Sequence, residues 1–377
     1  MSKLWNKRTN SLTPYVAGEQ PRNGEKVIKL NTNENPYPPS PEIKKFLQSY
    51  DLSNLRKYPD TTAEELREVI SSFYQVPKDW VFCGNGSDEV LAFAFQAFFE
   101  AGQDAEPITF CDITYSFYPV YAQLYDIPTR LIPLKKDYCV EVSAFLEKSG
   151  GVVLANPNAP TGIALPAADI IRIVESDPER LVLVDEAYAA FSDESVIPYL
   201  SRYPNLLVTG TVSKAHALAG IRVGFAIGNP ELIEGLCRVR DSFNSYPVDS
   251  LAIKIAAIAF RDKTWLNQNV EKIKKTRKRA ANILEKTGFS VLPSQTNFIF
   301  ASPPGNKEAH GNDTPEDKKE TSKYPDAAAL YQILKEKGIL IRYFKQPRID
   351  NYLRITIGSD EEMDAMLSVI KDIYGEN

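Results

Sequence analysis

Residues 209–225 read TGTVSKAHALAGIRVGF and join two apolar segments of strand character. The first, residues 206–211, runs directly towards Ser213 and Lys214, and Arg222 opens the second. A lysine amine at the mouth of a buried strand can form a Schiff base with an aldehyde cofactor, while hydroxyls and a guanidinium hold its phosphate. The alternative is a solvated surface lysine beside a loop, so the interpretation depends on the rest of the chain.

Composition excludes several classes of protein. The chain has 377 residues, enough for two domains, and its net charge of −5 gives no basic footprint for nucleic acid or an anionic membrane. No apolar run is long enough to span a bilayer, and the N-terminus lacks the apolar core of a signal peptide. Four scattered cysteines and two histidines make a metal site improbable. We therefore expect a reduced, cytoplasmic enzyme without a metal.

The spacing of apolar runs predicts the architecture. Short apolar strands alternate with helices: residues 81–83, 108–113, 129–134, 152–156, 181–185 and 206–211. Such alternation is typical of an α/β fold with a mostly parallel central sheet that helices cover on both faces. Ligands bind outside the carboxyl ends of such strands, and polar motifs stand at those ends: residues 84–88, Tyr115, Asn158, Asp185 with Tyr188, and Lys214.

The segment GNGSDE, residues 84–89, adds a second anion-binding signal. Glycines follow a strand, and a long apolar helix then begins near Ser87 and Asp88. The free N–H groups and the dipole of a helix N-terminus favour a phosphate. A simple helix cap would have the same sequence.

Three segments are expected along the chain. Residues 1–40 form a proline-rich arm that contributes to the substrate site and a dimer, residues 41–246 form the large cofactor-binding domain, and residues 247–377 form a smaller α+β domain. Residues 303–323 have no aliphatic side chain larger than alanine, so we expect a mobile inserted loop there.

Seven motifs occur in the order typical of the histidinol-phosphate aminotransferases, and the chain resembles that family over nearly its whole length: LNTNENPYPPS, YPD, GNGSDE, NPNAPTG, DEAYAAF, TVSKAHALAGIRVGF and LRITIG. The resemblance implies the class II, fold type I group of enzymes that use pyridoxal 5′-phosphate. It also implies a homodimer with shared active sites, in which Tyr58 reaches the phosphate of the neighbouring subunit.

The resemblance gives roles to the residues at the strand ends. Lys214 forms the Schiff base and acts as a base, Asp185 keeps the pyridine nitrogen protonated, and Tyr188 donates to the phenolic oxygen. Tyr115 stacks on the ring. The phosphate is expected to contact the backbone of Gly86, Ser87 and Asp88, the hydroxyls of Thr211 and Ser213, and Arg222. Asp185 could instead cap a helix, and both tyrosines could be packed core residues.

One position departs from the family pattern. Ala159 stands where the family often has an asparagine that hydrogen-bonds the ring oxygen of the cofactor. The adjacent Asn158 could replace it after a small backbone adjustment, or the bond could be missing.

For the substrate, the resemblance points to Tyr15, Asn33, Arg342 and Arg354. An arginine within an apolar strand is unfavourable unless an anion meets it, although an internal salt bridge would also satisfy it. The expected reaction exchanges the amino group between L-histidinol phosphate and 2-oxoglutarate in histidine biosynthesis. Alternatives on the same scaffold are an aromatic aminotransferase or an amino-alcohol-phosphate decarboxylase, and from another class a non-catalytic regulator that binds the same cofactor.

Overall fold

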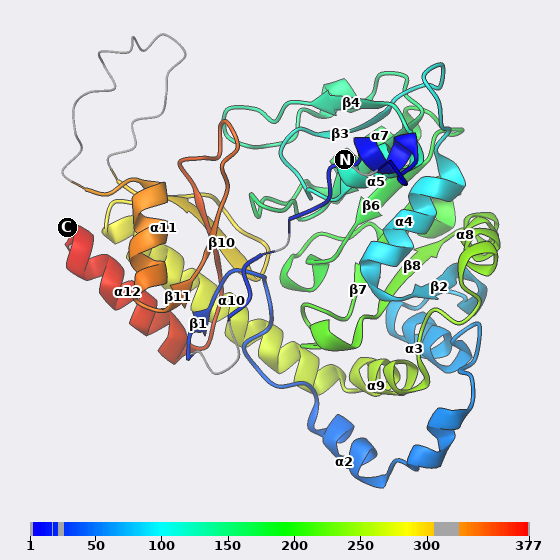
Figure 1. The fold of residues 1–377 in the computed structure, drawn as a ribbon, viewed down its shortest axis with the longest axis horizontal. Helices are drawn as coiled ribbons and strands as arrows, with labels where there is room; N and C mark the ends of the chain where they lie inside the picture. Colours follow the sequence, from blue (N-terminus) through cyan, green and yellow to red (C-terminus); the bar gives the residue numbers. More distant parts are fainter. Residues whose placement is uncertain (1–2, 17, 22–25, 305–323, 376–377) are drawn as a thin grey trace.

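A seven-stranded sheet forms the centre of the computed structural model, which describes residues 3–16, 18–21, 26–304 and 324–375 (Figure 1). Its spatial order is β2 (Val81–Gly84), β8 (Gly224–Gly228), β7 (Leu206–Thr211), β6 (Val182–Asp185), β5 (Gly151–Ala155), β3 (Ile108–Cys111) and β4 (Thr129–Ile132). Only the pairings of β8, with β2 and with β7, are antiparallel. The predicted α/β class with a mostly parallel sheet is therefore confirmed.

Helices cover this sheet and lead into the C-terminal part of the chain. Those from the N-terminus to residue 243 are α1 (Lys7–Ser11), α2 (Pro41–Ser49), α3 (Glu64–Tyr74), α4 (Gly86–Phe98), α5 (Tyr118–Tyr125), α6 (Val142–Phe145), α7 (Ala167–Glu175) and α8 (Pro230–Phe243). The others are α9 (Ser250–Arg261), α10 (Lys263–Lys286), α11 (Ala327–Glu336) and α12 (Asp360–Tyr374). None of the described helices is both long and apolar enough to cross a membrane.

A second, smaller sheet stands beside the first (Figure 1). It is antiparallel, in the order β12 (Arg342–Tyr343), β13 (Leu353–Thr356), β10 (Phe298–Ser302) and β9 (Ser290–Val291). Next to it, β1 (Ile28–Lys29) of the N-terminal arm pairs in parallel with β11 (Ile339–Leu340). The arm is therefore part of the C-terminal structure, which its proline-rich sequence alone does not reveal.

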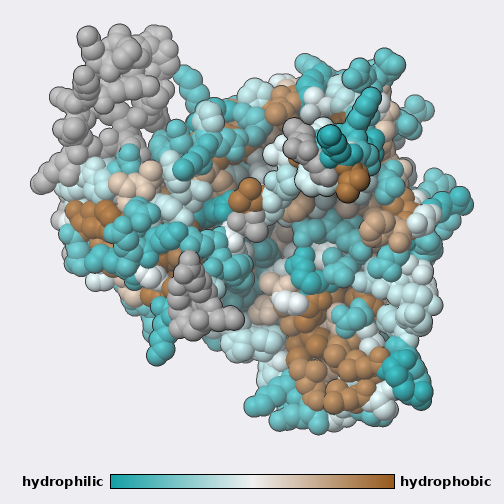
Figure 2. All heavy atoms as spheres, in the orientation of Figure 1, coloured by the Kyte–Doolittle hydropathy of each residue, from teal (hydrophilic) through white to brown (hydrophobic). Residues whose placement is uncertain are grey.

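Helix α9 begins directly after the predicted domain boundary at residue 247. Its buried side chains, among them Ile253, Ala256 and Phe260, belong to the same hydrophobic cluster as those of the large sheet, and the bounds of the two domains stay a prediction. Part of the α9 surface remains apolar and open, and Figure 2 shows this patch over the helix. The expected loop at residues 303–323 lies, beyond residue 304, outside the described residues.

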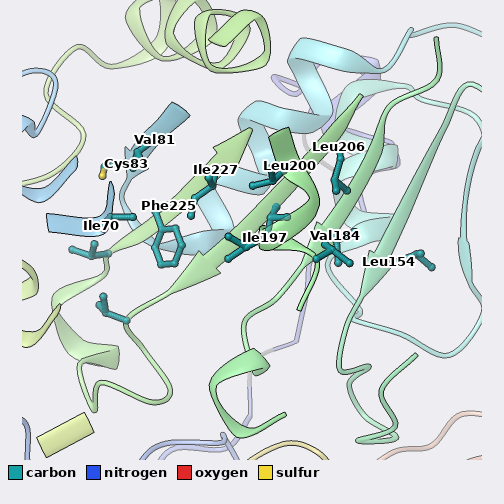
Figure 3. Packing of buried hydrophobic residues seen from close by; sticks show 14 of the residues in the cluster. Ile70, Val81, Cys83, Leu154, Val184, Ile197, Leu200, Leu206, Phe225 and Ile227 are labelled. Atoms are coloured by element: carbon teal, nitrogen blue, oxygen red, sulfur yellow. The ribbon is translucent and has the colours of Figure 1, made fainter. Parts of the chain in front are cut away.

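The core of the large sheet fixes the site because its strands are buried on both faces. Val184 of β6 and Leu206 of β7 are fully buried, as is Ile227 of β8 (Figure 3). Ile197 and Leu200 of a 3-10 helix, Ile197–Arg202, pack against them from one side. Ionisable side chains are absent from the interior of β5, β6, β7 and β8, and the carboxylate of Asp185 stands at the end of its strand.

Candidate active site

A cavity of about 310 Å³ lies at the carboxyl ends of the parallel strands. Nine predicted residues line it: Ser87, Asp88, Tyr115, Asp185, Tyr188, Thr211, Ser213, Lys214 and Arg222. They come from the ends of β2, β3, β6 and β7, as expected for polar groups excluded from a covered parallel sheet. The structure therefore brings segments more than a hundred residues apart into one site.

Lys214 crosses this cavity towards the N-terminal arm. Its half-buried side chain donates from Nζ to the backbone oxygen of Thr32 at 3.4 Å, and Nζ lies 5.8 Å from the centre of the Tyr188 ring. The side chain of Asn35 donates to the Lys214 carbonyl at 3.1 Å. These contacts exclude the alternative of a solvated surface lysine.

Asp185 is a buried carboxylate at the end of β6. Its oxygens accept hydrogen bonds from the Tyr118 hydroxyl at 3.1 Å and from the backbone N–H of Ala187 at 3.2 Å. Burial raises the pKa of Asp185 to about 6, against the lowering effect of these hydrogen bonds. None of the ion pairs among the described residues includes Asp185, so the carboxylate is positioned to receive a positively charged ligand group.

The start of helix α4 forms one end of the cavity, through Ser87 and Asp88. Gly86 has a φ of +80°, and a Cβ there would meet Arg222 Nη2 at 2.6 Å. A Cβ on Gly224 would lie 2.3 Å from the backbone nitrogen of Ser87, so only glycine lets β8 approach the helix this closely. The free N–H groups of the first turn and the nearby guanidinium make this a suitable phosphate cradle.

Side-chain hydrogen bonds hold the cradle in place. Arg222 Nη2 forms a salt bridge of 2.7 Å with Asp88, and the Tyr115 hydroxyl donates to the other carboxylate oxygen at 2.9 Å. The Thr211 hydroxyl donates to Ser213 Oγ at 2.8 Å. The side chain of Asp88 thus orders Arg222 and Tyr115, a role that its position in the motif does not indicate.

Asn33 connects the arm to the site. Its Nδ2 donates to the Tyr188 hydroxyl at 2.8 Å, and its Oδ1 accepts from the hydroxyl of Thr356 at 3.1 Å. The side chain of Asn297 donates to the Asn33 carbonyl at 3.0 Å. Asn33 is therefore buried in contacts with protein groups and fixes the orientation of Tyr188.

Two arginines lie side by side on adjacent strands of the small sheet. Arg342 of β12 and Arg354 of β13 are direct register partners, so two like charges stand side by side. Their hydrogen bonds within the described chain go to carbonyl oxygens, of Val16 at 3.4 Å and of Asn31 at 2.9 Å. The predicted alternative, an internal salt bridge, is thus not what the described residues provide.

Arg354 in particular lacks a partner for part of its guanidinium. Its Nε is shielded from solvent without a hydrogen bond, and the rings of Phe298 and Phe344 flank it at 5.4 and 5.6 Å. Burial lowers the pKa of Arg354, and the neighbouring Arg342 charge lowers it further. Phe298 packs both against the Arg354 guanidinium, at 5.4 Å, and against the ring of the cavity-lining Tyr188, at 5.2 Å, so the arginine lies beside the cavity. An anion between the arginines would relieve their repulsion.

Three of the predicted site residues, Asn158, Tyr58 and Tyr15, have their main contacts outside the cavity. Asn158 does not line the cavity: its amide donates to the Ile113 carbonyl and accepts from the Thr114 hydroxyl, and Ala159 faces the cavity instead. The expected cofactor contact of Asn158 therefore finds no support in this geometry. Tyr58 is exposed and stacks on Tyr246 at 4.5 Å, away from the cavity of its own chain.

Tyr15 lies on the arm and contacts the ring of Phe117 at 4.5 Å. This contact, together with the effect of Tyr15 on Arg354, places the arm over the aromatic segment that follows β3.

Sequence reasoning missed Tyr118 and Glu34. Tyr118 is fully buried at the start of α5, and only its position near a strand end hinted at a polar partner. Glu34 lines the cavity and pairs with Lys29 at 2.6 Å. Burial acts to raise the pKa of Glu34, but the hydrogen bonds from Lys29 and Thr32 outweigh it, so the pKa is lowered and the side chain is charged. The sequence signal for Glu34 is its place in the LNTNENPYPPS motif, between Asn33 and Asn35.

The raised pKa of Asp185 predicts a specific pH dependence of stability. Because the folded pKa is about 6 and the unfolded pKa is lower, the folded state is penalised progressively as pH rises from about 4 to 6, and fully above 6. In the cofactor-free protein, Asp185→Asn should raise the free energy of unfolding at pH 7.5 by about 2–3 kcal/mol. The gain should vanish near pH 4.

Urea denaturation at the two pH values measures this effect. Asp249→Asn, at the exposed N-cap of α9, is the matched control and should change stability little at either pH, because asparagine also caps a helix. A loss of stability in Asp185→Asn at pH 7.5 would contradict the proposed unpaired carboxylate.

Comparisons with known proteins agree with this geometry. The model of the family "Aminotransferase class I and II" matches residues 25–370. A protein of Chromohalobacter salexigens named histidinol-phosphate aminotransferase is 45% identical over 99% of both chains. The crystal structure of histidinol-phosphate aminotransferase from Sinorhizobium meliloti in complex with pyridoxal-5′-phosphate has the same fold, with a TM-score of 0.83, 23% identity and coverage of 99% of this chain and 98% of that chain.

The fold alone does not separate sister activities. L-threonine-O-3-phosphate decarboxylase from Porphyromonas gingivalis also matches, with a TM-score of 0.75 and 21% identity over 92% of this chain and 99% of that chain. Sequence identity and the family model are more specific. On both grounds, this chain belongs to the class I and II aminotransferases, within the histidinol-phosphate aminotransferase family.

Proposed function

We propose that the protein is a pyridoxal-phosphate-dependent aminotransferase that converts L-histidinol phosphate and 2-oxoglutarate to imidazole acetol phosphate and L-glutamate in histidine biosynthesis. The observation that carries the proposal is the half-buried arginine pair beside the cavity of Lys214. Both substrates of the exchange are anions, a phosphate ester and a dicarboxylate. Planar guanidinium groups can bind either anion in two-point fashion.

The residues present fit pyridoxal phosphate. When bound, this cofactor supplies an aldehyde for amines and a ring that accepts electrons from the reacting carbon. The N–H groups at the start of α4, Thr211, Ser213 and Arg222 would hold its phosphate, and buried Asp185 lacks the cation that a protonated pyridine nitrogen provides. Tyr118 orients the Asp185 carboxylate through the hydrogen bond to Oδ2.

Lys214 is the group placed to move a proton. Its side chain lines the cavity, and its amine lies near the Tyr188 ring and the arm carbonyl of Thr32. Released from the cofactor, the amine would take the proton from the substrate carbon that carries the amino group. Asn33 holds the Tyr188 hydroxyl at 2.8 Å, so the tyrosine is oriented before substrate arrives.

A homodimer with shared sites is the second part of the proposal. Tyr58 is 82% exposed and lies in a stretch whose leucines, Leu52 and Leu55, are also exposed. The nearby apolar patch over α9 enlarges this surface (Figure 2). An apolar surface of this kind is typical of a protein interface, and a partner chain would bring Tyr58 to the phosphate end of the other cavity.

Four free cysteines suit a reducing location such as the cytoplasm.

An amino-donor screen of the purified, cofactor-loaded protein tests the function. Single half-reactions are followed by the change in cofactor absorbance, with histidinol phosphate, glutamate, phenylalanine and tyrosine as donors. Rapid reaction with the first two and slow reaction with the aromatic acids is expected. Lys214→Ala should react with none of them. Comparable rates with the aromatic acids would instead assign a broad aromatic aminotransferase. Release of carbon dioxide from a phosphorylated hydroxy amino acid would assign a decarboxylase that forms an amino-alcohol phosphate.

Arg354→Lys separates anion binding from chemistry. Lysine keeps the charge but loses the planar two-point contact, so kcat/KM should fall about tenfold to a hundredfold with both histidinol phosphate and glutamate. The cofactor absorbance should stay unchanged. Arg279→Lys, in the surface ion pairs between α10 and α12, is the matched control. Unchanged kinetics in Arg354→Lys would remove this arginine from the substrate site.

Hybrid dimers test the shared site. Tyr58→Ala and Lys214→Ala homodimers should have low and no activity, respectively. In a mixed dimer, one cavity combines an intact Lys214 with the intact Tyr58 of the other chain. Because random 1:1 mixing makes half of the dimers hybrid, activity should recover to about a quarter of wild type. If Tyr58 acts within its own chain, or the chain stays monomeric, mixing restores nothing.

A further inference from the structure

A second cavity adjoins the active-site cavity on the opposite side of the β6 and β7 strand ends. Its volume is about 210 Å³, and Ala187 and Thr211 line both cavities. The far wall is helix α10, through Leu266, Asn267 and Val270. The catalytic residues described above, Lys214 included, do not line it, yet Ala215 and His216 directly after that lysine do.

His216 brings an unused hydrogen-bond acceptor to this cavity. Its side chain is buried, with only 5% exposed, and its Nδ1 is shielded from solvent without a partner. A hydrogen bond to the Ala259 backbone engages the other ring nitrogen, and burial lowers the pKa of His216 to about 4. The ring is therefore neutral near pH 7, protonated on the nitrogen that faces Ala259, and Nδ1 carries a lone pair that lacks a donor.

The other lining residues limit which ligands could donate a hydrogen bond to Nδ1 of His216. Phe73, Tyr74 and Phe225 contribute aromatic surface. Glu186 is the one acidic side chain among the described residues of the lining. Burial raises the pKa of Glu186 to about 7, and its carboxyl accepts from the Val196 N–H at 2.7 Å and from the Ser195 hydroxyl at 2.8 Å. The described residues of the lining include no arginine or lysine, so an anionic ligand would find no opposite charge in this cavity. The complementary ligand is neutral or cationic, has apolar faces and carries an N–H group.

We propose that this cavity is a second ligand site, which takes a small planar heteroaromatic ring whose N–H donates to Nδ1 of His216. Size agrees with this class, because an apolar cavity of about 150 Å³ in another protein is enough for benzene. An imidazole ring is of suitable shape and supplies the one N–H donor that Nδ1 of His216 lacks. Occupancy would press on Ala215 and Thr211 and thus connect the site to Lys214 through the backbone.

Two five-membered rings of nearly equal size test the proposal on the cofactor-loaded wild-type protein. Imidazole has an N–H group, whereas oxazole has a ring oxygen in its place. Calorimetric titration at pH 8 should give binding of imidazole about tenfold tighter than binding of oxazole, as expected for one hydrogen bond. Equal affinities would overturn the proposal, as would the absence of imidazole binding at millimolar concentration, which would leave water as the occupant.

His216→Phe provides the matched variant, because it keeps a ring in place and removes the acceptor. Its affinity for imidazole should fall at least about tenfold, while inorganic phosphate, which addresses the arginine pair, should leave wild-type affinity for imidazole unchanged. Equal binding to the variant, or competition by phosphate, would place imidazole in the active-site cavity and contradict the proposal. If the variant does not fold, the comparison of the two probes on wild type remains decisive.

Discussion

The structure depends on a sheet that is covered on both faces. Strands such as β6 and β7 have apolar side chains along their buried length, so every group that can carry charge must stand where the strand ends. Asp185 and Lys214 follow this constraint directly. The same constraint explains why one cavity collects residues from four strands, and why the antiparallel strand β8 needs Gly224 to lie against the first turn of α4.

Two buried charges in the site have no counter-ion in the described chain. Asp185 has its pKa raised by burial, and Arg354 faces a second arginine. Both arrangements weaken the folded state by themselves, and both become favourable when a ligand supplies the opposite charge. The Asp185 side and the Arg354 side of the cavity thus share one feature with opposite signs, a charge that the protein's own residues do not neutralise. A ligand that supplies both opposite charges gains affinity at both sides.

The parts of the site that sequence predicts are those fixed by local pattern. Asp185 ends an apolar strand, Lys214 follows one, and Gly86 begins a helix. The apolar pattern of the sequence and the residue types typical of strand and helix ends therefore predict where these three residues lie. Contacts between distant segments were not predictable: Tyr118 with Asp185, and β1 with β11. Helix α9 was missed as a unit because its apolar sequence continues into the charged α10 after a single capping residue, Asp262. Asn158 shows the limit of a motif, since its neighbours take up its whole amide.

The N-terminal arm has a mechanical consequence. It pairs with β11 through β1, it holds Tyr188 through Asn33, and it holds the Lys214 backbone through Asn35. A rotation of the small sheet about α10 would therefore pull on the tyrosine ring and on the peptide of the lysine at the same time. The arm therefore links the small sheet to the Lys214 segment directly, so that the distance between the arginine pair and Lys214 is set by a span of a few residues rather than by the long path of the chain through α10.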